Sequence, residues 1–227
     1  ASLKVMGQAK YNQEFECSFI GNIQGSIYGD LLNEMEDKKQ ITRVPHDPAY
    51  PVSTSWDLGF NDATAVVFFQ RIGHQINIID YYEKNNEAFP HYAQVLKEKP
   101  YTYEFHYGPH DLEQTDFATG RTRRETAFQL GLRFKIAKKL PVEEGIHSVK
   151  MLLPRCQIDI DHCTKLINAL RHYHRKYNDK DRIYSAKPVH SWASHACDAI
   201  RTLAVGLENN SFNNTTLQKE YKYEFNL

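Results

Sequence analysis

The stretch VSTSWDLGFNDATAVVFFQ (residues 52–70) contains the pattern that decides the fold. Its first part, residues 52–58, combines apolar and small residues in the manner of a strand and carries Asp57 near its end. The GFND segment that follows (residues 59–62) has the composition of a turn. Residues 63–70 form an almost unbroken apolar run, which is typical of a strand buried on both faces.

A third strand is predicted over residues 75–82 (QINIIDYY), after a turn at Gly73. Three strands joined by two short turns form an antiparallel meander. We therefore expect the first strand to present Asp57 at one end of a sheet.

The rest of the sequence alternates between helical and strand patterns. The predicted helices cover residues 88–98, 121–130, 142–153, 161–177 (capped by Asp161) and 192–207, and the predicted strands cover residues 103–107, 132–136 and 156–160. Residues 178–187 are predicted to be a charged loop. A meander followed by alternating helices and strands predicts an α/β fold with a mixed sheet and helices on both faces.

Three closely spaced prolines, Pro45, Pro48 and Pro51, indicate a boundary between two parts of the chain. We expect one compact domain over residues 51–207. Residues 1–50, with a short amphipathic helix over residues 28–39, are predicted to be a linker or N-terminal extension. Residues 208–227 are Asn-rich and are predicted to be a C-terminal tail.

The composition limits the class of protein. Hydrophobic residues make up 41% of the 227 residues, which is enough for a sizeable core. No apolar run approaches the roughly 20 residues that cross a bilayer, so we do not expect a membrane protein. The four cysteines, including Cys17, form no CxxC pair, and a disulfide-stabilised scaffold is excluded at this length and cysteine density.

The formal net charge is zero, but the charges are segregated along the chain. Residues 121–187 contain 16 Lys and Arg against 7 Asp and Glu, whereas the rest contains 12 against 21. A basic segment beside an acidic remainder favours a protein that binds a polyanion near a carboxylate site. The candidate contacts to a DNA backbone are Arg121, Arg123, Arg124, Lys135, Lys138 and Lys139. A solvated helix face would give the same pattern.

Three aspartates are the candidates for chemistry. Asp57 ends a strand, Asp111 directly follows another strand, and Asp198 lies inside a helix among small and apolar residues. A carboxylate in such a helix is costly unless something compensates it. Divalent Mg²⁺ or Mn²⁺ would do so, and two such ions can hydrolyse a phosphodiester. The alternatives are a turn at Asp57, a cap at Asp111 and an ion pair of Asp198 with Arg201.

His195 lies three residues before Asp198 and so on nearly the same face of the helix. An imidazole there would ligate a metal or carry a proton. A surface histidine or a capping histidine is the alternative.

Three stretches together resemble one family of nucleases. They are SWDLGFNDATAVVFF (residues 55–69), HYGPHDLEQ (residues 106–114) and SWASHACDAIRTLA (residues 191–204). They resemble the nuclease domain of the large terminase subunit of tailed bacteriophages, which is similar to RNase H and the Holliday-junction resolvases. The resemblance covers roughly residues 51–207 and implies an RNase H-like fold.

The resemblance also implies roles for individual residues. Asp57, Asp111 and Asp198 would be the metal-binding acids. His195 matches a histidine that some members place next to the last acid. Asp62 occupies the second acid of the segment DLGFND, where it would support the ligands or replace one of them.

The implied activity is that of a metal-dependent endonuclease that cuts double-stranded viral DNA concatemers during genome packaging. The implied cofactors are two ions of Mg²⁺ or Mn²⁺. The implied partners are double-stranded DNA, the portal protein, the small terminase subunit and the ATPase domain of the same polypeptide, in the host cytoplasm. No GxxxxGK[ST] motif occurs in the sequence, so we expect the packaging ATPase to lie outside it.

Two other functions use the same residues. One is a resolvase- or transposase-like nuclease of the same fold, which four-way junction substrates would distinguish from a packaging nuclease. The other is a non-catalytic module that docks on DNA or on the portal, which would show no metal-dependent cleavage.

Overall fold

The computed structural model describes residues 23–59, 62–117 and 120–224, with side chains described as far as residue 208. The strands are β1 (Ile41–Thr42), β2 (Val52–Asp57), β3 (Thr64–Ile72), β4 (Gln75–Lys84), β5 (Tyr103–Gly108), β6 (Phe134–Ile136), β7 (Cys156–Asp159), β8 (Arg175–Asn178) and β9 (Ile183–Pro188). The α-helices are α2 (Gly29–Asp37), α3 (Phe89–Glu98), α4 (Arg123–Gln129), α5 (Val142–Leu152), α6 (Thr164–His172) and α7 (Ala193–Glu224). Two short 3₁₀ helices are η2 (His110–Glu113) and η3 (Leu153–Arg155).

The central sheet has seven strands in the order β1-β7-β4-β3-β2-β5-β6. Strands β2, β3 and β4 pair antiparallel, which confirms the predicted meander. The outer strands are added in parallel, with β5 beside β2, β6 beside β5 and β7 beside β4. The parallel pairing of β2 with β5 brings the end of β2 next to the segment that follows β5.

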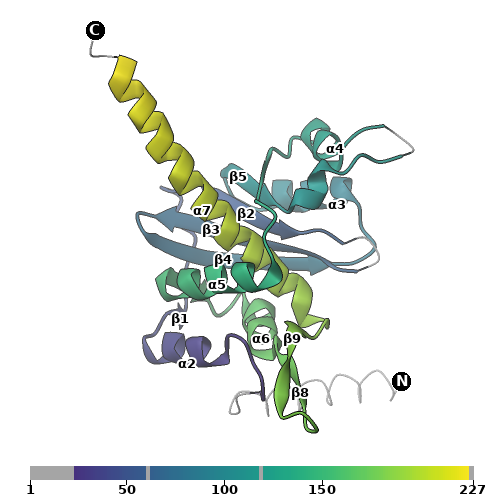
Figure 1. Cartoon of the computed structure of the whole chain (residues 1–227). Coiled ribbons are helices and arrows are strands. Elements are labelled where there is room, and N and C mark those ends of the chain that lie inside the picture. The colour runs from purple at the N-terminus through teal and green to yellow at the C-terminus, as the bar shows by residue number, and fades with distance from the viewer. Residues whose placement is uncertain (1–22, 60–61, 118–119, 225–227) are drawn as a thin grey trace, which may run out of the picture.

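Each face of the sheet is covered by its own layer of helices, and this confirms the predicted mixed α/β architecture (Figure 1). Strand β3 shows the division, because alternate residues enter different cores. Val67 packs into the core shared with α2, α5, α6 and α7. Its neighbours Val66 and Phe68 pack into the core shared with α3 and α4.

Helix α7 crosses the sheet over β2 and packs against α5 and α6 (Figure 1). Small side chains on β2 let it approach closely. The Ser55 hydroxyl donates a hydrogen bond of 2.6 Å to the backbone carbonyl of Ala199 in α7. This contact places Asp198, the preceding residue of α7, close to the end of β2.

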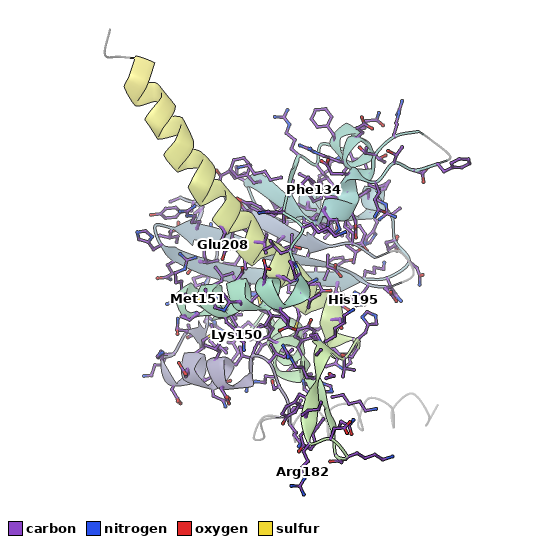
Figure 2. All side chains as sticks on the ribbon, in the orientation of Figure 1. Phe134, Lys150, Met151, Arg182, His195 and Glu208 are labelled. Atoms are coloured by element: carbon purple, nitrogen blue, oxygen red, sulfur yellow. The ribbon has the colours of Figure 1, made fainter. Side chains whose placement is uncertain are left out.

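A β-hairpin formed by β8 and β9 lies where we predicted the end of a helix over residues 161–177 and a charged loop over residues 178–187. Helix α6 ends at His172, after which β8 and β9 pair antiparallel. Both strands are polar and largely exposed, so they lack the apolar alternation that identifies a strand from sequence. Figure 2 shows Arg182 at the tip of this hairpin.

The predicted cap of α6 was also wrong. The residue before the helix is Cys163, which makes no capping bond through its side chain. The nearby carboxylate that accepts a backbone N–H is Asp159, from His162 at 2.8 Å.

Helix α7 continues to Glu224, beyond the end that we predicted at residue 207. Neither a proline nor a glycine follows Gly206 to stop it. In Figure 1 its C-terminal half extends away from the sheet.

The segment before the three prolines also contributes to the main core. Leu32 and Met35 of α2 are buried there, and β1 pairs in parallel with β7. Residues 1–22 of the predicted extension, including Cys17, lie outside the described residues. The domain boundary at residue 51 stays a prediction.

Among the described residues, we find no helix whose length and apolar character would let it traverse a bilayer.

Candidate active site

Asp57 is the last residue of β2 and lies at the edge of the sheet, as predicted. Its side chain is 22% exposed, and its Oδ2 lies 3.1 Å from Nδ1 of His195. This hydrogen bond raises the pKa of His195 above its usual value, against the opposing effect of burial. The first aspartate and the histidine are therefore joined directly.

Asp198 projects from α7 toward the same place. Burial raises the pKa of its carboxyl to about 6, the nearby Arg201 lowers it, and the negative charge of Asp57 raises it further. Nη1 of Arg201 lies 2.8 Å from Oδ1 of Asp198, so the ion pair considered as the alternative to a metal-binding role is present. The pair is close in distance but not aligned, because this buried oxygen accepts no hydrogen bond from any described group.

Asp111 lies on η2, directly after β5. It is the most exposed of the three acids, with 44% of its side chain accessible. Its Oδ1 accepts a hydrogen bond of 3.1 Å from Gln114 and lies 3.2 Å from Nε2 of His110.

One cavity of about 200 Å³ is lined by all three aspartates. Its other lining residues are Pro109, His110, Ala137, Lys138, Lys139, Leu140, Gly145, Arg201, Thr202 and Val205. Side chains that are far apart in the sequence thus share one concave surface. Gly145 is needed there, because any Cβ at that position would collide with the side chain of Arg201.

This cavity has the chemistry that a divalent cation requires. It offers carboxylate oxygens, the ligands preferred by Mg²⁺ and Mn²⁺. The buried Oδ1 of Asp198 pairs with the charge of Arg201 at 2.8 Å but accepts no aligned hydrogen bond among the described residues, so it keeps acceptor capacity for a ligand. The residues therefore fit a bound metal ion.

The mutual distances divide the predicted ligands into two groups. Among the described residues, the only three candidate ligands whose atoms all lie within 4.8 Å of one another are Asp62, His190 and His195. The three acids line the cavity in a more open arrangement. Asp62 is thus placed beside His195 rather than in the cavity of the three acids.

The predicted basic residues occupy different places. Lys138 and Lys139 line the cavity with the acids. Nζ of Lys135 instead lies 3.1 Å from the centre of the Phe105 ring, and burial lowers the pKa of its amine. Arg124 pairs with Glu113 at 2.9 Å.

Two further arginines lie on the neighbouring α4 region. Arg121 and Arg123 are exposed, and Arg123 borders a separate pocket of about 260 Å³ with Phe89 and Tyr92.

Sequence reasoning missed two histidines that lie at the site. His190 directly precedes the motif at residues 191–204, and His110 directly precedes Asp111. This adjacency to a predicted motif or acid is the only sequence signal that could have identified either histidine. The positions of the two histidines beside the acids became visible only when the chain segments were placed in space.

The sequence matches the family model described as the terminase RNaseH-like domain over residues 54–199. A curated relative, the large terminase subunit of Escherichia phage T5, is 26% identical over 199 residues, which are 84% of this chain and 44% of the relative. The resemblance inferred from the three motifs is therefore confirmed. The chain spans less than half the length of that relative.

Solved structures of large terminase nuclease domains have the same fold. The domain from P22 has 17% identity and a TM-score of 0.56, covering 74% of this chain and 87% of that one. The domain from bacteriophage SPP1, solved with bound Mn, has 17% identity and a TM-score of 0.52, covering 67% of this chain and 84% of that one.

Proposed function

Because the chain belongs to the family of terminase RNaseH-like domains, we propose that it is the nuclease part of a large terminase subunit. In this proposal it cuts double-stranded viral DNA concatemers by metal-dependent hydrolysis during genome packaging. The observation that carries the proposal is the shared cavity of Asp57, Asp111 and Asp198, in which a buried carboxylate oxygen has no hydrogen-bond partner among the described residues.

Asp57, Asp111 and Asp198 would hold the metal, which we propose to be two ions of Mg²⁺ or Mn²⁺. The bound Mn of the SPP1 domain supports a divalent ion in this fold. When bound, such ions supply the positive charge that stabilises the developing charge on a phosphodiester and the acidity that activates a water molecule.

The protein side chains would prepare the site for that chemistry. Arg201 at 2.8 Å favours the charged form of Asp198 despite its burial. His195 holds one oxygen of Asp57 in place through the hydrogen bond of 3.1 Å. A histidine with a neighbouring carboxylate can also accept or release a proton near neutral pH.

Lys138 and Lys139 would hold the DNA backbone next to the acids. They line the same cavity as Asp111, and Lys attracts phosphate without reading the base sequence. Arg121, Arg123, Arg124 and Lys135 would extend this contact away from the cavity. We therefore expect cleavage that depends little on sequence and decreases with salt.

The larger assembly follows from the family. The proposed partners are the portal protein, the small terminase subunit and the ATPase domain of the same polypeptide, in the host cytoplasm. Within this chain, we propose residues 51–207 as the nuclease domain, residues 1–50 as the connection to the ATPase and residues 208–227 as a tail.

Plasmid cleavage tests this function. We expect the chain to nick and linearise supercoiled DNA with Mn²⁺ or Mg²⁺ and to stop when the metal is chelated. Asp57→Ala should reduce the rate at least about 10³-fold, because several kcal/mol of charge stabilisation are lost with the metal. Asp37→Ala, an exposed acid on α2, is the matched control. Equal rates for the two variants would contradict the proposal.

A further inference from the structure

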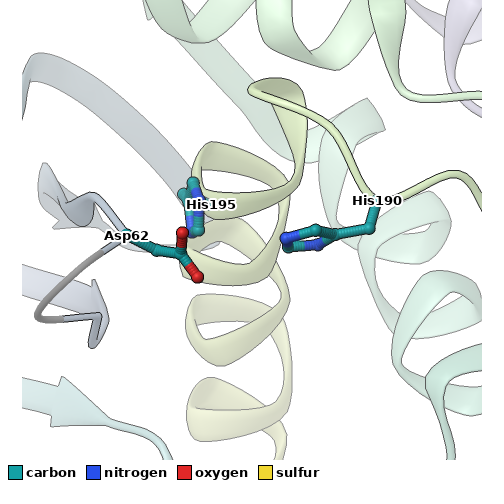
Figure 3. Close-up of side chains that lie close together, drawn as sticks. All are labelled: Asp62, His190 and His195. Carbon is teal, nitrogen blue, oxygen red and sulfur yellow. The ribbon is translucent and has the colours of Figure 1, made fainter.

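Three side chains beside the acid cavity point toward one another (Figure 3). Asp62 comes from the turn between β2 and β3, His190 from the segment before α7, and His195 from the first turn of α7. One ligand atom from each lies within 4.8 Å of those of the other two. The fold therefore brings the carboxylate of Asp62 to two imidazoles that are five residues apart on a distant part of the chain.

His195 is held in the manner of a metal-binding histidine. Its Nδ1 lies 3.1 Å from Oδ2 of Asp57, which leaves Nε2 for another partner. Histidines that bind metal commonly donate their other ring N–H to a carboxylate, which fixes the tautomer and the ring orientation. This hydrogen bond is independent of the cluster geometry and points to the same conclusion.

The two imidazoles are not stacked on each other. The ring centres of His190 and His195 are 5.8 Å apart, and the rings are nearly perpendicular at 87°. A perpendicular arrangement lets a nitrogen of one ring face the region in front of the other. Aromatic pairs also adopt this geometry, so it is the carboxylate of Asp62, within 4.8 Å of a ligand atom of each ring, that distinguishes the cluster from an aromatic contact.

The local charge favours a cation. The carboxylates of Asp57, Asp62 and Glu83 all act on His195 in the direction that stabilises positive charge there. Asp62 and His190 are exposed, so their side chains have space to move closer together. A tetrahedral ion with bonds of about 2.0–2.1 Å would require such a movement, on the order of 1 Å.

We propose that Asp62, His190 and His195 form a second metal site, which takes a borderline transition-metal ion such as Zn²⁺. Two histidines and one carboxylate are a ligand set that Zn²⁺ uses when a water completes the coordination. Mg²⁺ prefers oxygen ligands alone, so the cavity of three aspartates and this site differ in the metal they select.

The hydrogen bond between His195 and Asp57 connects the two sites. An ion on Nε2 of His195 keeps the proton on Nδ1 and so commits one oxygen of Asp57 to that bond. Metal binding at the histidine site rests only on these residues and not on the proposed nuclease activity. The connection to the acid cavity rests on the proposed function.

Titration with Co²⁺, a spectroscopic substitute for Zn²⁺, tests this site in the whole chain. With Mg²⁺ in excess to occupy oxygen sites, we expect one equivalent of Co²⁺ to give the visible absorption of four-coordinate Co²⁺ bound to imidazole. His190→Ala should weaken binding at least about 10-fold and reduce this absorption, because one ligand is lost. His74→Ala, an exposed histidine in the turn between β3 and β4, should bind Co²⁺ as the unmodified chain does.

Asp57→Ala tests whether Asp57 orients His195 or binds the Co²⁺ ion itself. We expect it to weaken Co²⁺ binding about 10–100-fold, the usual effect of losing the group that orients a ligand, with the shape of the absorption unchanged. The inference is overturned if His190→Ala binds Co²⁺ as tightly as the unmodified chain, or if no such absorption appears. Intact Co²⁺ absorption in a chain that cleaves DNA with neither Mg²⁺ nor Mn²⁺ would overturn the proposed function and support this site.

Discussion

The polar groups near the end of strand β2 have different surroundings on its two faces. On the face toward α3 and α4, Nε1 of Trp56 donates to Thr54 Oγ1 at 2.6 Å, and the same hydroxyl lies 2.7 Å from Nδ1 of His106. On the face toward α7, Asp57 lies beside Asp198, one of whose buried oxygens has no hydrogen-bond partner among the described residues.

This difference indicates that one set of polar groups stabilises the fold and that the other is available for a ligand. The network of Thr54, Trp56 and His106 is completed within the protein, as buried polar groups usually are. Asp57 at the end of the strand and Asp198 on α7 keep acceptor capacity for a ligand beside their pairing with His195 and Arg201, and the charge of Asp57 makes Asp198 harder to ionise. Such an arrangement lowers stability unless a ligand supplies what is missing.

The largest effect is expected from Asp198→Asn, which removes the charge but keeps the shape. Cleavage should fall at least about 10³-fold, because a metal ligand is lost. The free energy of unfolding at pH 7 without metal should rise, by at most about 3 kcal/mol, since a buried charge is removed. Plasmid cleavage and urea denaturation measure the two effects. A variant that is both less active and less stable would mean that Asp198 is a structural residue.

The two faces should also respond to pH with opposite signs. Burial lowers the pKa of His106 from 6.5 to about 4, so the folded protein binds fewer protons and loses stability as pH falls through this interval. Burial raises the pKa of Asp198 from 3.8 to about 6, so the folded protein binds more protons and loses stability as pH rises through that interval. Each effect amounts to about 3 kcal/mol.

Two variants isolate these contributions. Between pH 4 and 6 without metal, the free energy of unfolding of Asp198→Asn should increase with pH more steeply than that of the unmodified chain, because the opposing contribution of Asp198 is removed. That of His106→Gln should change in the opposite direction relative to the unmodified chain. Denaturation at several pH values gives these slopes, and changes of the same sign in the two variants would refute the assignment.

Thr54→Val is expected to have a smaller effect, confined to stability. It deprives the Trp56 N–H and the His106 ring of their shared hydroxyl, which should cost about 1–3 kcal/mol. Cleavage by the folded protein should persist. Thr54→Ser keeps the hydroxyl and is the control. Loss of cleavage in a fully folded Thr54→Val protein would mean that the hydrogen-bond network on one face of β2 also supports the acid site on the other face.

The smallest expected effect is on the salt dependence of DNA binding. Lys138→Ala and Lys139→Ala should each reduce the slope of log affinity against log salt by about 0.9, because both residues line the acid cavity. Lys135→Ala should change it less, since its amine lies over the Phe105 ring. Fluorescence anisotropy on a duplex measures the slopes, and equal changes for the three lysines would contradict this ranking.

The parts of the molecule that the sequence predicted are those with strong local patterns. The apolar runs of β3 and β4 specify the meander, and Asp198 is conspicuous because a carboxylate is costly among small apolar residues of a helix. The β8–β9 hairpin has no such pattern, because its strands are polar and exposed. The two-residue strand β1 is too short to be recognised.

The site was predicted less completely than the fold, for a physical reason. Asp57, Asp111 and Asp198 each stand at an unusual place in a local pattern, so they could be proposed one by one and assigned a role through the family resemblance. The placement of Asp62 beside the two histidines and of Lys138 in the cavity of Asp111 depends on how distant segments pack. No local spacing carries that information.

The most direct test of the central claim is a crystal of the chain soaked with Mn²⁺ and measured for anomalous scattering. We predict anomalous density between Asp57, Asp111 and Asp198, with oxygen atoms of Asp57 and Asp198 bonded to the ion. Anomalous density that is absent from this cavity while the three aspartates remain ordered would contradict it.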